Sequence, residues 1–381
     1  MKKKVLVLVR YYIPGFKAGG PIQSIKNMVD NLSNEIDFYI LTSDRDSGDK
    51  QPYKGIETDK WIKMEKAYVY YTNINNINTT KMKEILASKD YDVLYLNSFF
   101  SYKFSILPVI LKKFKKLPNK PLVVAPRGEF SEGALGIKGT KKKIYLSIIK
   151  LLGLYRNVTW HVTAENERKD IERVFGKEQK IKVANNLTED YSRLDYTKEI
   201  NKKVGELNLV FLSRISPKKN LKKAIKLLRN IQGDVKFTIY GALSDKEYWN
   251  ECQQEIAKLP QNIVVNYEGV INHSNVLEMF KKSHIFFFPT LGENFGHVIS
   301  EALIGGCPVI ISDQTPWNNL EKQNVGWDIG LSNEDKFIEV LQHCVDMGDE
   351  DYQTMSRNAF EYGKKLSNKK EEVMRTYNLF N

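Results

Sequence analysis

Two glutamates and the loop between them have the most chemically suggestive spacing in the chain. Glu293 and Glu301 lie eight residues apart in the segment from Phe286 to Ile310. An apolar run ending at Pro289 predicts a buried strand, and a glycine-containing loop then opens a helix near Phe295. The first turn of a helix offers free backbone N–H groups and the positive end of its dipole. We expect this turn to bind an anion, with Glu293 placed to accept hydrogen bonds from sugar hydroxyls and Glu301, about two turns further, to reach a ribose.

Two cations follow another predicted strand and are suited to bind phosphate. The apolar run Leu207–Leu212 predicts the strand, and Arg214 and Lys219 come after it, five residues apart. A nucleoside diphosphate gains negative charge as it leaves, and two cations would offset that charge. Lys218 is an alternative to Lys219 for this role, because the two lysines are adjacent and the spacing does not distinguish them. A basic turn before a helix at Asn220 is the structural alternative.

A glycine pair after the first predicted strand gives a third candidate site. Gly19 and Gly20 lie in the segment Lys17–Ile22, and a helix is predicted to follow. Glycines let a backbone approach a phosphate closely, and the helix adds its dipole. The segment does not match the GxGxxG fingerprint, which disfavours a dinucleotide site. An ordinary turn remains the alternative.

Polar residues near two further strands complete the candidates. Arg127 and Glu129 follow the strand Leu122–Pro126, where the arginine is suited to bind phosphate or an acceptor and the glutamate to act as a general base. His161 lies on the strand Val158–Thr163. A lone histidine on a strand can be packed and hydrogen bonded or can be catalytic, and both roles stay open here.

The elements that position these residues alternate between strand and helix, twice along the chain. Continuous apolar runs such as Val5–Val9 are typical of strands buried on both faces of a parallel sheet. The polar stretch Thr188–Glu206 interrupts the alternation, and we interpret it as a linker. We predict two Rossmann-like, doubly wound α/β domains at 1–188 and 205–365 with a cleft between them, and a C-terminal helix at 366–381 that returns toward the first domain.

These motifs resemble those of the retaining glycosyltransferases of family 4, which have the GT-B fold. The run Glu293–Glu301 matches the E-x7-E motif of that family, and Asp313–Trp317 is similar to a common continuation. Arg214 and Lys219 match its pair of cations. The resemblance covers nearly the whole chain and is strongest over 209–317.

The resemblance implies an enzyme of the hexosyltransferase type that moves a sugar from a UDP- or GDP-sugar to a hydroxyl group of a glycan or lipid-linked acceptor. The second domain would bind the donor and the first the acceptor. Relatives need no metal or other cofactor, and they often build capsule, lipopolysaccharide or other lipid-linked glycans. The implied catalytic residues are Glu293, Arg214 and Lys219, and the implied donor-binding residues are Gly19, Gly20, Asn294, Phe295, Gly296 and Glu301.

The chain departs from the family at one candidate position. Many relatives carry His-Gly or Arg-Gly at the end of this strand of the first domain, and those with histidine use it near the reacting centre. This chain has Arg127 followed by Gly128. A role that depends on histidine therefore cannot be transferred to this position.

A net charge of +12 favours phosphate-bearing or polyanionic partners. Nucleic-acid binding is one alternative, but it needs a basic stripe with stacking aromatic residues, whereas the lysines here flank helices. We therefore expect no nucleic-acid partner. A nucleotide-sugar epimerase of the same fold is another alternative. The sequence around Glu293 and Glu301 argues against it.

Cysteine usage and hydropathy indicate a cytoplasmic protein. The three cysteines have no paired spacing, and no apolar run is long enough to cross a bilayer. The run Val5–Val9 is too short for a signal peptide. Two lysine clusters are either solvated helix faces or a patch that contacts anionic lipid at the inner face of the plasma membrane. These clusters are Lys112, Lys113, Lys115, Lys116 and Lys141, Lys142, Lys143.

Overall fold

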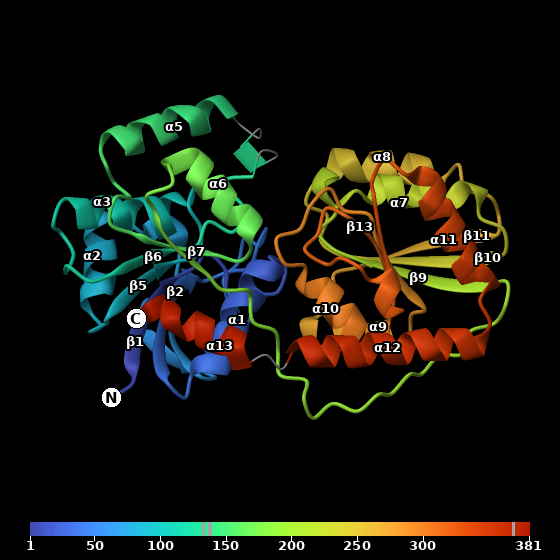
Figure 1. Cartoon of the computed structure of the whole chain (residues 1–381). Coiled ribbons are helices and arrows are strands. Elements are labelled where there is room, and N and C mark those ends of the chain that lie inside the picture. Colours follow the sequence, from blue (N-terminus) through green and yellow to red (C-terminus); the bar gives the residue numbers. More distant parts are fainter. Residues whose placement is uncertain (132–133, 136–138, 368–369) are drawn as a thin grey trace. The chain divides into compact units, whose positions relative to one another are not determined.

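The chain forms two α/β units (Figure 1). A computed structural model describes residues 1–131, 134–135, 139–367 and 370–381. The first unit comprises Met1–Glu189 and Lys370–Asn381, and the second comprises Asp190–Lys369. No helix in the described ranges is long and apolar enough to cross a membrane.

The first unit is built on an eight-stranded sheet with the order β3-β4-β2-β1-β5-β6-β7-β8. All neighbouring strands are parallel except β3 and β4, which form an antiparallel pair. The strands are β1 (Lys3–Leu8), β2 (Ile36–Ser43), β3 (Trp61–Met64), β4 (Ala67–Thr72), β5 (Val93–Leu96), β6 (Leu122–Val124), β7 (Thr159–Val162) and β8 (Lys180–Val183). The helices are α1 (Gly20–Leu32), α2 (Thr79–Ala87), α3 (Leu107–Lys113), α5 (Gly139–Leu151), α6 (Glu165–Phe175) and α13 (Lys370–Tyr377).

Alternate residues of the strands enter two separate cores, one on each face of this sheet. In β1, Leu6 and Leu8 pack with residues of α2, α3, α5 and α6. Val5 and Val7 pack on the other face with residues of α1 and with Leu379 and Phe380 near the C-terminus. Because both faces are covered, the residues of β1 from Val5 to Leu8 are all apolar, as expected from the sequence.

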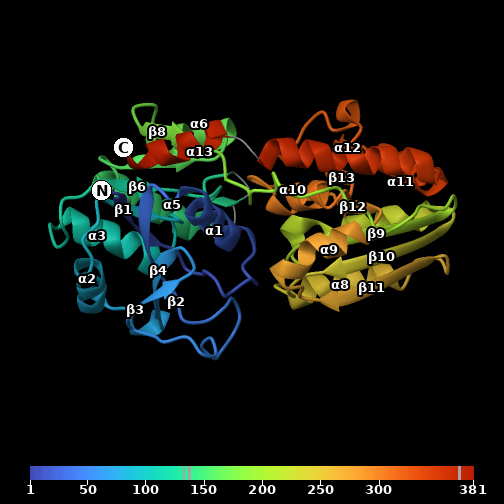
Figure 2. The ribbon, with the colours of Figure 1, turned by 90° about the horizontal axis from the view of Figure 1, so that it is seen from below.

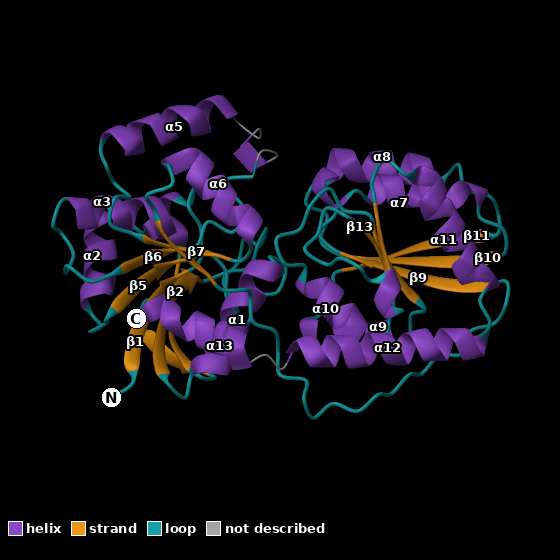
Figure 3. Cartoon of the chain, in the orientation of Figure 1, coloured by secondary structure: helices purple, strands orange, loops and turns teal. Residues whose placement is uncertain are grey.

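The second unit contains a six-stranded, all-parallel sheet with the order β11-β10-β9-β12-β13-β14. Figure 2 shows β13, β12, β9, β10 and β11 side by side in that order. The strands are β9 (Glu206–Leu212), β10 (Asp234–Tyr240), β11 (Ile263–Gly269), β12 (Ile285–Phe288), β13 (Val309–Ser312) and β14 (Gly326–Ile329). The helices are α7 (Leu221–Leu227), α8 (Lys246–Ile256), α9 (Val276–Lys281), α10 (His297–Ile304), α11 (Glu334–Asp346) and α12 (Asp349–Ser367), and Figure 3 shows them around the sheet.

Strand order reverses once in each sheet, and these places position the candidate residues. In the second unit, β10 and β12 pair with opposite edges of β9. In the first unit, β2 and β5 pair with opposite edges of β1. A crevice forms outside the carboxyl ends of the strands at such a switch point, and ligands of doubly wound sheets bind there. The loops after β1, β9 and β12 carry most of the residues selected from the sequence, and Arg127 and Glu129 follow β6.

The stretch expected to be a linker belongs to the second unit from Asp190 onward. The buried ammonium of Lys202 donates to the carbonyls of Val345 and Met347, at 2.9 and 3.0 Å, where α11 ends. Lys198 donates in the same way to Ser283, at 2.8 Å, just after α9. Lysines that bind carbonyl groups at helix ends fasten this polar stretch to the unit.

Candidate active site

The switch point of the second unit brings Lys219 and Glu293 into direct contact. Lys219 follows β9 and Glu293 follows β12, and the ammonium forms an ion pair with Oε1 of the carboxylate. Both side chains are largely buried, with exposed fractions of 11% and 17%. The ammonium also lies 5.6 Å from the ring centre of Phe288, the last residue of β12. The predicted cation and the predicted sugar-binding acid therefore form one pair.

Backbone contacts join the two loops that carry this pair. The N–H of Leu291 donates to the carbonyl of Lys218 at 2.9 Å. The Thr290 hydroxyl donates to the same carbonyl at 3.1 Å, and the Asn220 amide donates to the carbonyl of Pro289 at 2.8 Å. Asn220 has a φ of 60°, a left-handed conformation that asparagine tolerates better than most residues. The turn after β9 is thus held against the turn after β12.

Two further cations surround the pair. Partial burial of its ammonium lowers the pKa of Lys218, the positive charges of Lys219 and Arg214 lower it further, and Glu293 opposes them. Lys218 and Arg214 are exposed as whole residues. Arg214 makes no hydrogen bond or ion pair with any residue that the structure describes. The cluster therefore contains three cations and the Glu293 carboxylate, and the excess positive charge suits an anionic ligand.

The glycine loop before α10 leaves backbone donors beside these charges. Gly296 precedes α10 with a φ of 77°, a left-handed conformation that favours glycine, and a Cβ there would lie 2.8 Å from Cδ1 of Ile299. The Trp317 indole donates to the carbonyl of Phe295 and fixes the loop. Within the described part of the chain, the N–H groups of Asn294, Phe295 and Gly296 have no hydrogen-bond acceptor. These donors are free at the turn where the sequence predicts an anion-binding site.

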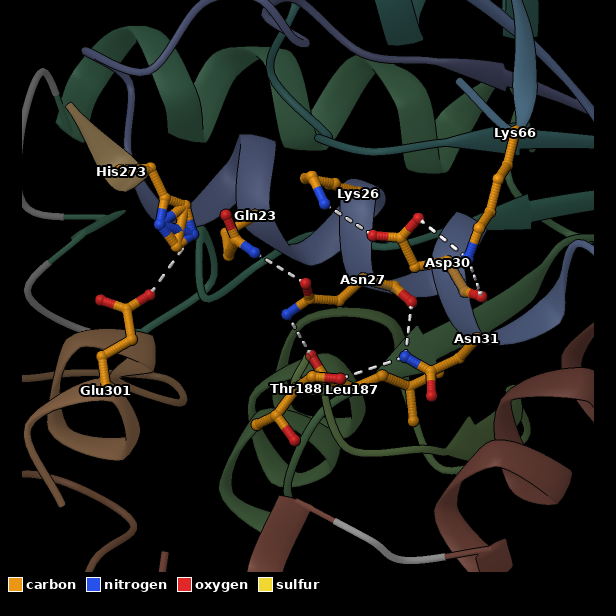
Figure 4. A network of polar contacts seen from close by, with 10 residues as sticks. All are labelled: Gln23, Lys26, Asn27, Asp30, Asn31, Lys66, Leu187, Thr188, His273 and Glu301. Atoms are coloured by element: carbon orange, nitrogen blue, oxygen red, sulfur yellow. Dashed lines mark hydrogen bonds and ion pairs between the residues drawn. The ribbon is translucent and has the colours of Figure 1, made fainter. Parts of the chain in front are cut away.

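Glu301 lies on the second turn of α10 and has a partner that the sequence did not indicate. Its Oε1 is 3.8 Å from Nε2 of His273 (Figure 4). The exposed fraction of the Glu301 side chain is 17%. His273 lies between β11 and α9, outside every motif selected from the sequence. Only tertiary packing brings His273 to Glu301, so the periodicity and spacing of the sequence could not predict this contact.

In the first unit, the glycine pair follows β1 as expected. Gly19 has a φ of 65°, and Gly20 is the first residue of α1. The carboxylate of Asp46 accepts hydrogen bonds from the N–H groups of Phe16 and Lys17, at 2.7 and 3.0 Å. This acid therefore fixes the backbone that leads into the glycine pair, a role that the sequence analysis missed.

Asp44 and Asp46 form an Asp-x-Asp pattern in the loop directly after β2, which ends at Ser43, and both aspartates are buried. Their oxygens are bound within the unit, by the Arg45 guanidinium and by backbone N–H groups. In the described residues, no three His, Cys, Asp or Glu side chains are grouped as a metal site requires.

A buried polar network holds α1 behind the glycine pair (Figure 4). The Gln23 amide donates to Asn27 at 2.7 Å, and the Asn27 amide donates to the carbonyl of Leu187 at 2.8 Å. The Asn31 amide donates to the carbonyl of Thr188 at 3.1 Å. These contacts fix α1 to the last residues before the unit boundary at Glu189.

Arg127 follows β6 and is surrounded by neutral oxygens. Its guanidinium donates to Oδ1 of Asn97 at 2.7 Å, to Oδ1 of Asn186 at 2.6 Å and to the hydroxyl of Tyr95 at 2.8 Å. Its φ of 54° is unusual for a residue with a Cβ. The Glu167 carboxylate, which is buried, fixes the turn by accepting the N–H of Gly128 at 2.6 Å.

His161 is enclosed in the same network. Its Nδ1 is 2.7 Å from the Tyr95 hydroxyl, and its Nε2 is 2.9 Å from the carbonyl of Ala184. Since a carbonyl can only accept, Nε2 carries the proton and Nδ1 accepts from Tyr95. Burial, reinforced by the charge of Arg127, lowers the pKa of His161 to about 3. Of its two open roles, this geometry favours the packed, neutral histidine.

Glu129 also makes contacts that limit its freedom. Its carboxylate accepts hydrogen bonds from the Ser98 hydroxyl at 2.9 Å and from the N–H groups of Phe99 and Phe100 at 2.6 and 3.0 Å. Burial raises its pKa, while these hydrogen bonds and the charge of Lys142 oppose the rise. The carboxylate holds the loop after β5, and a base role would require it to release these donors.

The model of the family called glycosyl transferases group 1 matches residues 192–362, nearly all of the second unit. This match contains the ion pair, both neighbouring cations and α10. The second unit therefore contains a group 1 glycosyltransferase domain.

Two curated proteins are similar in sequence to this chain. The glycosyltransferase is 21% identical over 329 residues to an uncharacterized 41.2 kDa protein in the cps region of Klebsiella pneumoniae, covering 85% of this chain and 86% of the relative. It is 25% identical over 181 residues to the alpha-monoglucosyldiacylglycerol synthase of Streptococcus pneumoniae, covering 44% of this chain and 40% of that enzyme.

Two solved structures share the fold over the whole length of the glycosyltransferase. Anabaena HepE, solved in complex with UDP and glucose, has a TM-score of 0.67 at 15% identity, with 99% of this chain and 98% of the other covered. A sucrose-phosphate synthase from Thermosynechococcus elongatus has a TM-score of 0.70 at 14% identity, with 100% and 98% covered. The predicted GT-B fold is confirmed.

Proposed function

We propose that this glycosyltransferase moves a sugar from a nucleoside diphosphate sugar, carried by UDP or GDP, to an acceptor hydroxyl with retention of anomeric configuration. One observation carries the proposal: the pair of Lys219 and Glu293, with Arg214 and Lys218 beside it, lies at the switch point of the second unit next to free N–H groups before α10. This arrangement suits a diphosphate joined to a sugar.

The proposed roles follow from charge and position. As the bond between the sugar and the phosphate breaks, the leaving diphosphate gains negative charge, which Arg214, Lys219 and the N–H groups before α10 stabilise. Glu293 binds the sugar hydroxyls, and Glu301 binds the ribose. In the free enzyme Glu293 balances the charge of Lys219, so the lysine is held in place before the donor arrives.

The proposed reaction needs no metal or other cofactor, because the cations of the protein take the role of a metal at the diphosphate. The first unit binds the acceptor, a glycan or lipid-linked saccharide, with Arg127, which follows β6, among the residues that contact it. The relatives in a cps region and in glucolipid synthesis support an acceptor of this class. We place the enzyme in the cytoplasm, in capsule, lipopolysaccharide or related glycan synthesis, with no nucleic-acid partner.

A donor screen tests the proposal. A ligand that binds only the native state raises the unfolding temperature, and about 100 times its Kd stabilises that state by about 2.7 kcal/mol. We expect UDP or GDP, and one of their sugars, to produce this shift, whereas adenosine diphosphate should not. With a sugar acceptor, nuclear magnetic resonance should show that the product keeps the anomeric configuration of the donor.

Two outcomes would contradict the proposal. If no nucleotide raises the unfolding temperature, the second unit does not contain a donor site. Interconversion of donor sugars in the absence of an acceptor would identify an epimerase of the same fold instead.

A further inference from the structure

Helix α5 of the first unit has apolar residues on two opposite faces. Leu146 and Ile149 point inward and are 9% and 2% exposed. Ile144, Ile148 and Leu151 point outward and are 57%, 49% and 86% exposed. Spacings of four and three residues place these three side chains on one stripe of the helix. Leu152, directly after the helix, is 52% exposed and extends the stripe.

Such a stripe is unusual on a soluble surface. Single exposed apolar residues are common, but contiguous apolar patches mark interaction sites. None of the residues of the candidate active site lies on α5. Figure 1 shows the helix along the outer edge of the first unit, beyond α6, and Tyr145 joins it to the core through Phe99.

The charges beside the stripe have one sign. The sequence of α5 contains four lysines and no acidic residue. At 100° per residue, Lys143 and Lys150 lie on one side of the stripe and Lys141 on the other, and all three are exposed. Lys142 is different, because its ammonium donates to the carbonyl of Ala134 and lies 4.9 Å from the ring centre of Phe100. Three lysines therefore flank the apolar residues, and the fourth faces the unit.

We propose that α5 lies in the surface of an anionic lipid bilayer, with Ile144, Ile148 and Leu151 inserted at the boundary of the acyl chains. An apolar stripe flanked by lysines is the pattern of interfacial helices, in which the lysines meet lipid phosphates. A second copy of the chain fits this face less well, because pairing two such stripes would bring lysines against lysines.

The proposal differs from the one drawn from lysine clusters alone. The cluster at the end of α3 contains one exposed apolar residue, Phe114, and its Lys112 is bound to the carbonyl of Lys120. That cluster has no apolar stripe, so α5 is the attachment site. Insertion of apolar side chains predicts that part of the binding survives high salt, whereas attachment by lysines alone would be lost.

Vesicle flotation tests this site without any measurement of sugar transfer, so the result does not depend on the proposed function. The probes are vesicles of phosphatidylcholine with and without phosphatidylglycerol, at low and high salt. The wild type should float with the anionic vesicles and keep part of its binding at high salt. The triple variant Ile144→Ser, Ile148→Ser, Leu151→Ser should bind at least about tenfold more weakly.

Two matched variants separate the contributions. Lys141→Gln, Lys143→Gln, Lys150→Gln should reduce binding at low salt and leave the salt-resistant part. Val204→Ser, a change at a 69% exposed residue of the second unit, should bind as the wild type does. Because all these side chains are exposed, unfolding temperatures should stay near that of the wild type, which confirms that each variant folds.

A tryptophan at position 148 reports insertion directly. The fluorescence of Ile148→Trp should shift to shorter wavelength with anionic vesicles and be quenched by brominated lipid. Flotation of the triple serine variant at the wild-type level would overturn the proposal. So would a wild-type dimer in solution that the same variant dissociates, because the stripe would then bind a second copy.

Discussion

The two units hold the arginines that follow their strands in opposite ways. In the second unit, Arg214 is exposed and has no partner among the described residues, while Lys219 and Glu293 pair beside it. In the first unit, Arg127 donates to three neutral oxygens and is linked through Tyr95 to a buried histidine. The first arrangement leaves charge available to a ligand, and the second uses the charge to organise the protein.

An arginine can bind a ligand or stabilise the fold, and a sequence motif alone does not distinguish these two roles. An arginine after a parallel strand predicts a phosphate site in either unit. The groups that the arginine contacts determine which property changes when the arginine is removed. Losing an exposed cation changes ligand binding, whereas losing a cation that satisfies buried oxygens changes the free energy of unfolding.

The largest effect should come from the charged cluster of the second unit. Lys219→Ala and Arg214→Ala should each weaken transition-state binding by about 2–4 kcal/mol, because each removes a charge-assisted contact to the diphosphate. Glu293→Gln should lower turnover about 10²–10³-fold with the fold intact. Steady-state transfer rates check this, with Lys281→Ala as control because it breaks an ion pair of 2.7 Å with Glu278 on α9. Wild-type turnover in the cluster variants would refute the assignment.

The next effect should be on stability and only in the first unit. Arg127→Ala should lower the free energy of unfolding by about 1–3 kcal/mol, since oxygens of Asn97, Asn186 and Tyr95 lose their donor. Arg214→Ala should leave that free energy unchanged. Urea unfolding of both variants makes the comparison. Equal stability of the two would show that the first arginine does not organise its unit.

Titration of His161 should make the free energy of unfolding depend on pH. Its pKa is about 3 in the folded protein and near 6.5 in an unfolded chain, so the unfolded state binds the extra proton between these values. The stabilisation is complete above about pH 6.5 and is lost as the pH falls toward 3, by at most about 1.4 kcal/mol per pH unit. His161→Gln should flatten this slope in urea unfolding between pH 6 and pH 4. An unchanged slope would assign the pH dependence to other groups such as His284.

Glu301→Gln should act on donor affinity more than on turnover. Its carboxylate lies a turn beyond the diphosphate site, so we expect KM for the donor to rise about tenfold, or about 1.4 kcal/mol, with kcat nearly constant. Kinetics at varied donor concentration will show the division between the two constants. A fall in kcat equal to that of Glu293→Gln would place Glu301 at the reacting sugar instead.

The smallest expected effect is that of a chelator. Since protein cations take the role of a metal in the proposed reaction, EDTA should leave the transfer rate unchanged. Loss of activity that Mn²⁺ or Mg²⁺ restores would contradict this prediction and require a new account of how the diphosphate charge is balanced.

Local patterns in the sequence predicted much of this molecule. The continuous apolar run of β1, the glycine pair before α1 and the loop before α10 were all readable, because each depends on residues close together in the chain. The strand-end positions of Arg127, Arg214 and Lys219 followed from the same patterns. The antiparallel strand β3 and the short edge strands β8 and β14 were missed, since they are too short to show periodicity.

Contacts between distant residues were not predictable from spacing. The pair of Lys219 and Glu293 joins residues 74 positions apart, and the partner of Glu301 lies outside every motif. Likewise, the sequence could not distinguish the inward Lys142 from the outward Lys141 and Lys143. Tertiary packing decides these cases, and a single sequence does not reveal it.

The last twelve residues have a consequence for biosynthesis. Leu379 and Phe380 fill the core against β1 and β2, and Phe380 lies 5.9 Å from Tyr95, ring centre to ring centre. A ribosome makes the 180 residues of the second unit after residue 189 and before these residues. At about 5–20 residues per second, the unit made first waits about 10–40 s for its last core residues. The nascent first unit therefore exposes the α1 face of its sheet during this interval, when chaperones have access to it.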